Sequence, residues 1–176
     1  MACSHVVECL RNREIEPEAF ATSKYDSSYE PSNALIYDKN SEFCSYGRPG
    51  DWWGVFFKVP VSIAGYQIEK FSVNSGSCAL YNWTLSLSID NKTWILVHGP
   101  IQSTSTDYSY NFSQSYNALY ARIDGNSLWS YDKTAIFFHY IMFFGLPTIV
   151  KIKVMTYLTR REMNLNLMRV VFLLYS

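Results

Sequence analysis

Short apolar stretches separated by polar, turn-rich stretches run along most of this chain. The strongest apolar stretch is residues 51–68, where two adjacent tryptophans lead into a run that Pro60 interrupts and that resumes across Gly65. Nearly continuous apolar runs of this length are typical of strands buried on both faces. The pattern therefore predicts strands at residues 55–59 and 63–71.

The clearest alternation of apolar and polar residues follows in residues 83–90. Trp83, Leu85, Leu87 and Ile89 are apolar, and the residues between them are polar. Side chains on a strand alternate between its two faces, so we expect the apolar set to face inward. Residues 90–92 supply a turn and residues 94–98 a returning strand, which predicts a hairpin.

Further short strands are predicted along the rest of the chain, at residues 35–37, 108–112, 119–123 and 136–144. The total is about eight strands at about ten-residue spacing, with no convincing helix between them. This spacing is typical of an all-β protein, and we predict an antiparallel β-sandwich.

The two ends of the chain differ from this middle part. Residues 1–19 are predicted to be partly helical, because Val6, Val7 and Leu10 share one helical face and Pro17 ends the run. So short a helix is not stable alone, and the segment is either the tail of a preceding domain or a strap across the sandwich. Residues 147–176 are basic and apolar; they form either an amphipathic helix or, as we favour, a poorly packed extension. The domain itself is predicted to span residues 20–146.

Composition narrows the possible functions. Hydrophobic residues make up 48% and aromatic residues 17%, with a formal net charge of zero. No basic cluster lies between residues 20 and 145, which argues against nucleic acid as a partner. No apolar run is long enough for a transmembrane segment, and the first residues lack a secretory pattern, so a cytoplasmic location is expected unless the chain is a fragment.

Motifs for catalysis and for cofactors are absent from the sequence. The cysteines, Cys3, Cys9, Cys44 and Cys78, have no zinc-like spacing and are expected to be free thiols. The histidines have no partner at metal or nucleophile spacing. The sequence therefore predicts no enzyme activity, no cofactor and no metal site.

Several segments, in the right order, resemble the coagulation-factor type C, or discoidin, domain. They are ATS at 21–23 with PSNAL at 31–35, DWWGVFF at 51–57, IAGY at 63–66, NWTL at 82–85 with DNKTW at 90–94, and YARI at 120–123 with IMFFG at 141–145. The likeness covers about residues 20–146. It implies a jelly-roll sandwich of the galactose-binding-like type, which binds carbohydrate, phospholipid headgroups or proteins without catalysis.

The resemblance also implies where the ligand would bind. Loops at one end of the sandwich, here residues 25–29, 37–43 and 74–81, would carry the contacts. Some sugar-binding relatives hold calcium through a carboxylate of the closing strand, where this chain has Tyr140 and Met142. Calcium prefers several hard oxygen ligands, so the departure argues against a strong metal site.

Five loop residues are the candidate ligand contacts. Tyr25 and Tyr29 offer rings that can stack on a sugar or enter a membrane interface. Asp26, Asp38 and Arg48 offer charge-assisted hydrogen bonds that would orient a ligand. The other reading is that the rings pack at the rim and the charges are merely solvated.

The tryptophans complete the expectations. Trp52, Trp83 and Trp94 are predicted to lie in the core, and one of Trp52 and Trp53 to lie near the loop end.

The function predicted first is a non-catalytic discoidin-like binding module. The alternative is an intracellular protein-interaction fragment of a multidomain protein, and a hydrolase using paired loop carboxylates is the third hypothesis.

Overall fold

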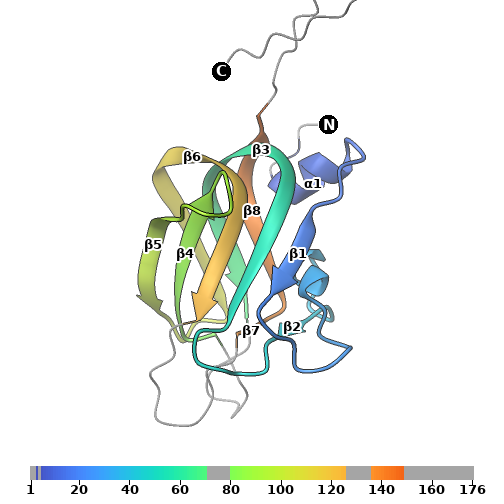
Figure 1. Ribbon diagram of the computed structural model, residues 1–176, viewed down its shortest axis with the longest axis vertical. Coiled ribbons are helices and arrows are strands. Elements are labelled where there is room, and N and C mark those ends of the chain that lie inside the picture. Colours follow the sequence, from blue (N-terminus) through green and yellow to red (C-terminus); the bar gives the residue numbers. More distant parts are fainter. Residues whose placement is uncertain (1–2, 4, 71–79, 126–135, 149–176) are drawn as a thin grey trace, which may run out of the picture.

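The computed structural model describes residues 3, 5–70, 80–125 and 136–148, which form a sandwich of antiparallel strands (Figure 1). The predicted all-β sandwich is thus confirmed. The elements are α1 (Val6–Arg11), β1 (Glu18–Ala21), the 3₁₀ helix η1 (Pro31–Leu35), β2 (Phe43–Cys44), β3 (Trp52–Glu69), β4 (Asn82–Ser88), β5 (Ile95–Gln102), β6 (Asp107–Gly125), β7 (Phe137–Phe138) and β8 (Tyr140–Pro147).

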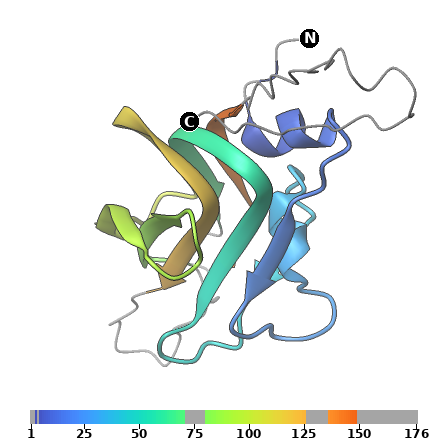
Figure 2. The same cartoon turned by 45° about the horizontal axis from the view of Figure 1, so that its top comes forward.

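Two long, bent strands, β3 and β6, belong to both layers of the sandwich. The first half of β3 and the second half of β6 lie in a front layer, in the order β1–β3–β6–β4–β5. The second half of β3 pairs with β8 and with the first half of β6 in the back layer. Figure 2 shows β3 arching from one layer into the other. The strands predicted at 55–59 and 63–71 are therefore one strand, and the same holds for 108–112 and 119–123.

The bend in β3 has a local cause. Its pairing with β6 breaks between Phe56 and Val61. Lys58 there adopts the left-handed φ of 67°, and Pro60 has no N–H to donate to a ladder. Further along, Gly65 touches the backbone of β6 so closely that a Cβ atom would overlap the carbonyl oxygen of Tyr110. Only glycine fits at that crossing.

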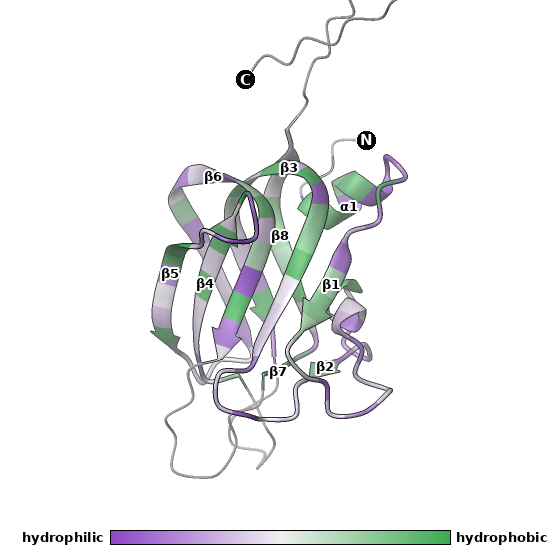
Figure 3. Ribbon diagram, in the orientation of Figure 1, coloured by the Kyte–Doolittle hydropathy of each residue, from purple (hydrophilic) through white to green (hydrophobic). Residues whose placement is uncertain are grey.

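The core between the layers is lined by alternate residues of the long strands. Trp53 and Trp83 are fully buried in it, together with the predicted inward residues Leu85 and Leu87. Figure 3 shows the resulting mixture of apolar and polar positions along β4 and β6. The expectation for Ile89 was wrong: it is 52% exposed, because β4 ends at Ser88 and Ile89 lies in the hairpin turn.

Two of the three tryptophans predicted to be in the core do not lie there. Trp52 and Trp94 are only partly buried, whereas Trp53 takes the inward position on β3. The reason is the parity of the strand, since adjacent residues point to opposite faces and Trp53 pairs with the inward Ile123. The strand predicted at residues 35–37 is also wrong, because Pro31 begins a 3₁₀ helix that ends at Leu35.

The N-terminal segment packs into the core, which agrees with the predicted alternative of a strap across the sandwich and not with a non-core extension. Val6, Val7 and Leu10 of α1 are completely buried against β8 and β3. After the helix the chain continues into β1, which pairs with β3 from Glu18 to Ala21. The sandwich thus begins well before residue 20, because the back layer leaves an apolar surface that α1 covers. The segment predicted as a C-terminal extension, apart from residues 147 and 148, lies outside the described residues.

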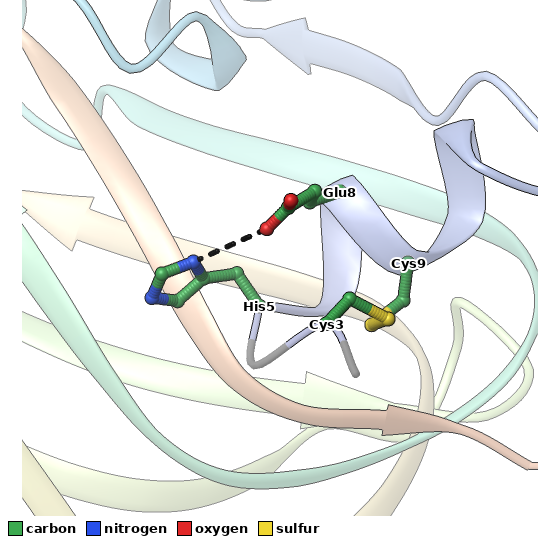
Figure 4. Close-up of a disulfide and its surroundings, with 4 residues drawn as sticks. All are labelled: Cys3, His5, Glu8 and Cys9. Atoms are coloured by element: carbon green, nitrogen blue, oxygen red, sulfur yellow. Dashed lines mark ion pairs between the residues drawn. A yellow bond between two sulfur atoms is a disulfide. The ribbon is translucent and has the colours of Figure 1, made fainter. Parts of the chain in front are cut away.

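Cys3 and Cys9 form a disulfide at the start of α1 (Figure 4), so the expectation of free thiols was wrong for this pair. Their Cα atoms are 5.4 Å apart because the chain turns into the helix at His5, whose backbone bridges to Phe144. Cys44 is buried, and Cys78 lies outside the described residues.

Among the described residues, no helix is both long and apolar enough to cross a bilayer.

Candidate functional site

Three tyrosines gather at the end of the sandwich where β1 finishes and β3 starts, the lower end in Figure 1. The ring centroids of Tyr25 and Tyr29 are 5.9 Å apart, and those of Tyr25 and Tyr46 are 6.3 Å apart. Tyr25 and Tyr46 are each 60% exposed, whereas the Tyr29 ring also packs on Phe137. The structure therefore brings the two predicted tyrosines together and adds Tyr46.

Arg48 completes this group. Its guanidinium carbon lies 5.1 Å from the centroid of the Tyr46 ring, a distance typical of a cation–π contact, and its side chain is exposed. A guanidinium beside open aromatic rings can donate hydrogen bonds to a ligand lying on those rings. Tyr25, Tyr29, Tyr46 and Arg48 are called the loop-end cluster below.

The two loops of the cluster are tied together by Asp51. This buried carboxylate accepts hydrogen bonds from the hydroxyls of Thr22 (3.0 Å) and Ser23 (2.8 Å), and from the backbone N–H groups of Gly47 and Arg48 (3.0 Å each). The donors come from both sides of the cluster. Asp51 thus acts as a positioning residue that holds the backbone on which Arg48 is carried.

Two further hydrogen bonds fix the tyrosines. The N–H of Tyr46 donates to the Ser23 hydroxyl at 3.0 Å, and the N–H of Tyr25 donates to the Cys44 carbonyl at 2.8 Å. Each tyrosine backbone is therefore bonded to the opposite loop. This arrangement presets the spacing of the rings before any ligand binds.

The surroundings of Asp51 favour its charged form. Burial alone would raise the pKa of this carboxyl, but hydrogen bonds from the Arg48 backbone and from the hydroxyls of Ser23, Ser45 and Thr22 outweigh it. The net effect is a pKa below the ordinary aspartate value. Asp51 is consequently ionised at neutral pH.

The two predicted aspartates act mainly within their own turns. The Asp26 carboxylate accepts from the N–H of Ser28 at 2.7 Å and stays exposed between Tyr25 and Tyr29 in the chain. Asp38 accepts from the backbone and the side chain of Asn40, at 2.9 and 3.0 Å. Its neighbour Lys39 pairs with Glu69 at the end of β3. Asp26 therefore lies beside the tyrosines in the chain. Asp38 bonds to Asn40 in its own turn, and these bonds do not connect it to the tyrosines.

The other predicted ligand loops contribute little to this cluster. The Tyr37 ring packs on His5 and Tyr140, so the loop at 37–43 starts from a side chain turned inward, and Phe43 is fully buried. Of the loop at 74–81, residues 74–79 lie outside the described residues. Within the part of the chain that is described, no group of three or more His, Cys, Asp or Glu side chains could hold a metal ion.

Sequence reasoning missed Tyr46 and Asp51. Tyr46 stands between polar residues and the turn-forming Gly47, a pattern that signals an exposed ring. Asp51 opens the strongest apolar run, where a lone carboxylate is expected to be buried and hydrogen-bonded. Neither pattern indicates which loops meet.

No family model matches this sequence, and no curated protein matches it. Solved structures, in contrast, do resemble it. A chitosan-binding module from a Paenibacillus sp. IK-5 chitosanase/glucanase superposes with a TM-score of 0.60 at 16% identity, covering 73% of this chain and 94% of that one. A fucose-binding module of Streptococcus pneumoniae gives a TM-score of 0.60 at 16% identity, covering 73% and 90%.

A third solved structure is a family 32 carbohydrate-binding module of Clostridium perfringens in complex with galactose. It superposes with a TM-score of 0.59 at 13% identity, covering 72% of this chain and 92% of that one. The chain therefore shares the β-sandwich fold of these modules. Identities this low establish the fold alone, and membership of the discoidin family stays a prediction.

Proposed function

We propose that this protein is a non-catalytic carbohydrate-binding module and that the loop-end cluster holds the sugar. The observation that carries the proposal is the pair of exposed rings, Tyr25 and Tyr46, with the Arg48 guanidinium 5.1 Å from the Tyr46 ring. Aromatic rings stack on the C–H face of a pyranose, and a charged donor fixes the orientation of its hydroxyls. The cluster supplies both functions on a preset backbone.

The solved structures of similar fold support this choice of ligand. They are a chitosan-binding module, a fucose-binding module and a module in complex with galactose. Asp51 would not contact the sugar in this proposal, because its carboxylate is already committed to four donors. Its role is to keep Arg48 and Tyr46 in place.

A glycan array with the purified protein tests the proposal. We expect the parent to bind at least one glycan, and Tyr46→Ala and Tyr25→Ala/Tyr29→Ala each to weaken that binding by about tenfold. Tyr46→Phe, which keeps the ring, should bind nearly as well as the parent. Ile95→Ala is the control, because Ile95 is also an exposed apolar side chain (58%) but lies on β5.

Several results would contradict the proposal. The parent could bind no glycan, or the tyrosine variants could bind as well as the parent. Turnover of chromogenic glycosides that is lost in Asp38→Asn would instead favour the hydrolase hypothesis. Retention of a cytosolic partner without glycan binding would favour the protein-interaction fragment, and binding to phosphatidylserine vesicles alone would favour a lipid ligand.

A further inference from the structure

A second aromatic surface lies on the outer face of the front layer, away from the core. The Phe56 and Tyr120 rings, from paired positions of β3 and β6, stack with centroids 4.7 Å apart and planes 13° apart. The Phe20 ring of β1 meets the Trp52 ring edge-on at 5.6 Å. All four side chains are partly exposed. Rings therefore cover positions where a sheet face that meets water normally carries polar residues.

Arg122 lies at the centre of this surface. Its guanidinium carbon is 4.6 Å from the Trp94 ring centroid and 5.8 Å from that of Trp52. Its Nε donates to the Asp124 carboxylate at 3.0 Å, and both side chains remain about a quarter exposed, at 28% and 25%. Two indoles and a carboxylate thus hold the arginine in one orientation. Phe20, Trp52, Phe56, Trp94, Tyr120 and Arg122 are called the outer-face strip.

Trp94 reaches the strip from the β4–β5 hairpin, which curls over the front layer in Figure 1. The hairpin is fixed by Asp90, whose carboxylate accepts from the N–H groups of Lys92 and Thr93 at 2.8 Å each. These backbone bonds lower the pKa of Asp90 to about 2. The carboxylate is therefore ionised at neutral pH, and Trp94 is held in place over β6.

The charges of this face cancel in pairs. Arg122 pairs with Asp124, and Lys58 pairs with Glu18 at 2.8 Å on the neighbouring strands. A nucleic acid or an anionic membrane needs concentrated positive charge, which this face does not offer. Flat rings, a fixed donor and a fixed acceptor complement a neutral ligand with many hydroxyls.

The strip adjoins the backbone that carries the loop-end cluster. Trp52 directly follows Asp51, and its backbone exchanges hydrogen bonds with Thr22. A ligand with several sugar residues could therefore touch both surfaces, whereas a single sugar could occupy only one.

We propose that the outer-face strip is a second carbohydrate-contacting surface, which takes an extended, neutral polysaccharide chain. This inference rests on the proposed function and adds that the ligand is a chain of several sugar residues. The Trp94 ring stacks on a sugar residue beside the stacked Phe56–Tyr120 pair, and Arg122 with Asp124 binds the neighbouring hydroxyls.

Affinity electrophoresis in native gels containing soluble galactan, xylan or mixed-linkage β-glucan tests the strip. We expect at least one polysaccharide to retard the parent, and Trp94→Ala to raise the dissociation constant by about tenfold. Trp94→Phe should recover most of the loss, because it restores a ring. Ile89→Ala, an exposed apolar residue of the same hairpin, should match the parent. Arg122→Gln gives a second reading if Trp94→Ala is poorly folded.

Methyl galactoside and methyl fucoside, titrated by calorimetry, separate the two proposals. Trp94→Ala should bind the simple sugars as the parent does, whereas Tyr46→Ala should bind them about tenfold more weakly. If Trp94→Ala and Arg122→Gln are retarded like the parent while Tyr46→Ala is not, the strip is overturned and the proposed function stands. If the parent binds none of these probes, both proposals are overturned.

Discussion

At the level of single residues, the buried carboxylate of Asp51 connects the two loops of the loop-end cluster. Thr22 and Ser23 approach it from one loop, and Gly47 and Arg48 approach it from the other. A charged acceptor satisfied by several donors is stable in a buried place, whereas the same donors without it would be left unpaired. One side chain therefore decides the shape of a surface that it does not itself expose.

Substitution of Asp51 by Asn should destabilise the fold by about 2–3 kcal/mol at pH 7, because an amide cannot accept all of these hydrogen bonds. It should also weaken glycan binding through the displaced Arg48. Urea unfolding and the glycan array measure the two effects. Unchanged stability would show that the donors find other partners.

The same residue predicts a pH dependence. The folded-state pKa of Asp51 is lower than its unfolded value, so its contribution is complete above about pH 4. That contribution is lost as the pH falls through the lowered pKa. The difference in stability between the parent and Asp51→Asn should therefore shrink below pH 4, and a difference that stays constant down to pH 2 would contradict the assignment.

At the level of elements, β5 and the first half of β6 meet through rings rather than through backbone pairing. The His98 ring of β5 stacks on Tyr110 of β6 with centroids 3.6 Å apart. The Trp83 indole donates to the Tyr66 hydroxyl at 3.0 Å, and that hydroxyl lies 2.9 Å from Nδ1 of His98. With the Tyr66 oxygen already accepting, its proton is directed to His98, which suits a neutral imidazole. This contact joins the edge strand β5 of the front layer to the first half of β6 in the back layer.

Burial among the rings of Tyr66, Tyr108 and Tyr110 lowers the pKa of His98. Because its folded-state pKa is below the unfolded value of about 6.5, its stabilising effect is present above that pH and is lost as the pH falls. The parent should therefore lose more stability between pH 7.5 and 5 than His98→Gln does. Equal losses in urea unfolding would contradict this.

At the level of the whole molecule, the bent strands β3 and β6 fold one hydrogen-bonded sheet into two layers. The helix α1 packs on the back layer, against β8 and β3. The N-terminal helix is thus part of the domain, because Val6, Val7 and Leu10 are buried with the strands. The disulfide of Cys3 and Cys9 at its start is a type of bond that persists in oxidising compartments. The expected cytoplasmic location stays a prediction.

Leu10→Ala should destabilise the whole domain by about 2–4 kcal/mol, because it leaves a cavity in the core. Leu96→Ala is the matched control, since Leu96 is 56% exposed and should change the stability by less than about 0.5 kcal/mol. Urea unfolding followed by tryptophan fluorescence measures both. A loss confined to α1, with the strands still folded, would restore the view that the segment is a separate extension.

The alternation of apolar and polar positions by itself determined that this protein is a β-sandwich, because a strand with one apolar face must bury that face against another layer. The same pattern determined the hairpin of β4 and β5, because the two strands and the turn between them are adjacent in the chain. It did not determine which tryptophan of the Trp52–Trp53 pair is buried, because that depends on the parity set by pairing with β6.

Tertiary structure alone decided the candidate site. Thr22 and Asp51 are 29 residues apart in the chain, and their hydrogen bond brings Tyr25 and Tyr46 onto one surface. The outer-face strip likewise combines residues from β1, β3, β6 and the hairpin. Local patterns carry information about propensity and burial, whereas contacts between distant segments depend on where the strands bend and pair.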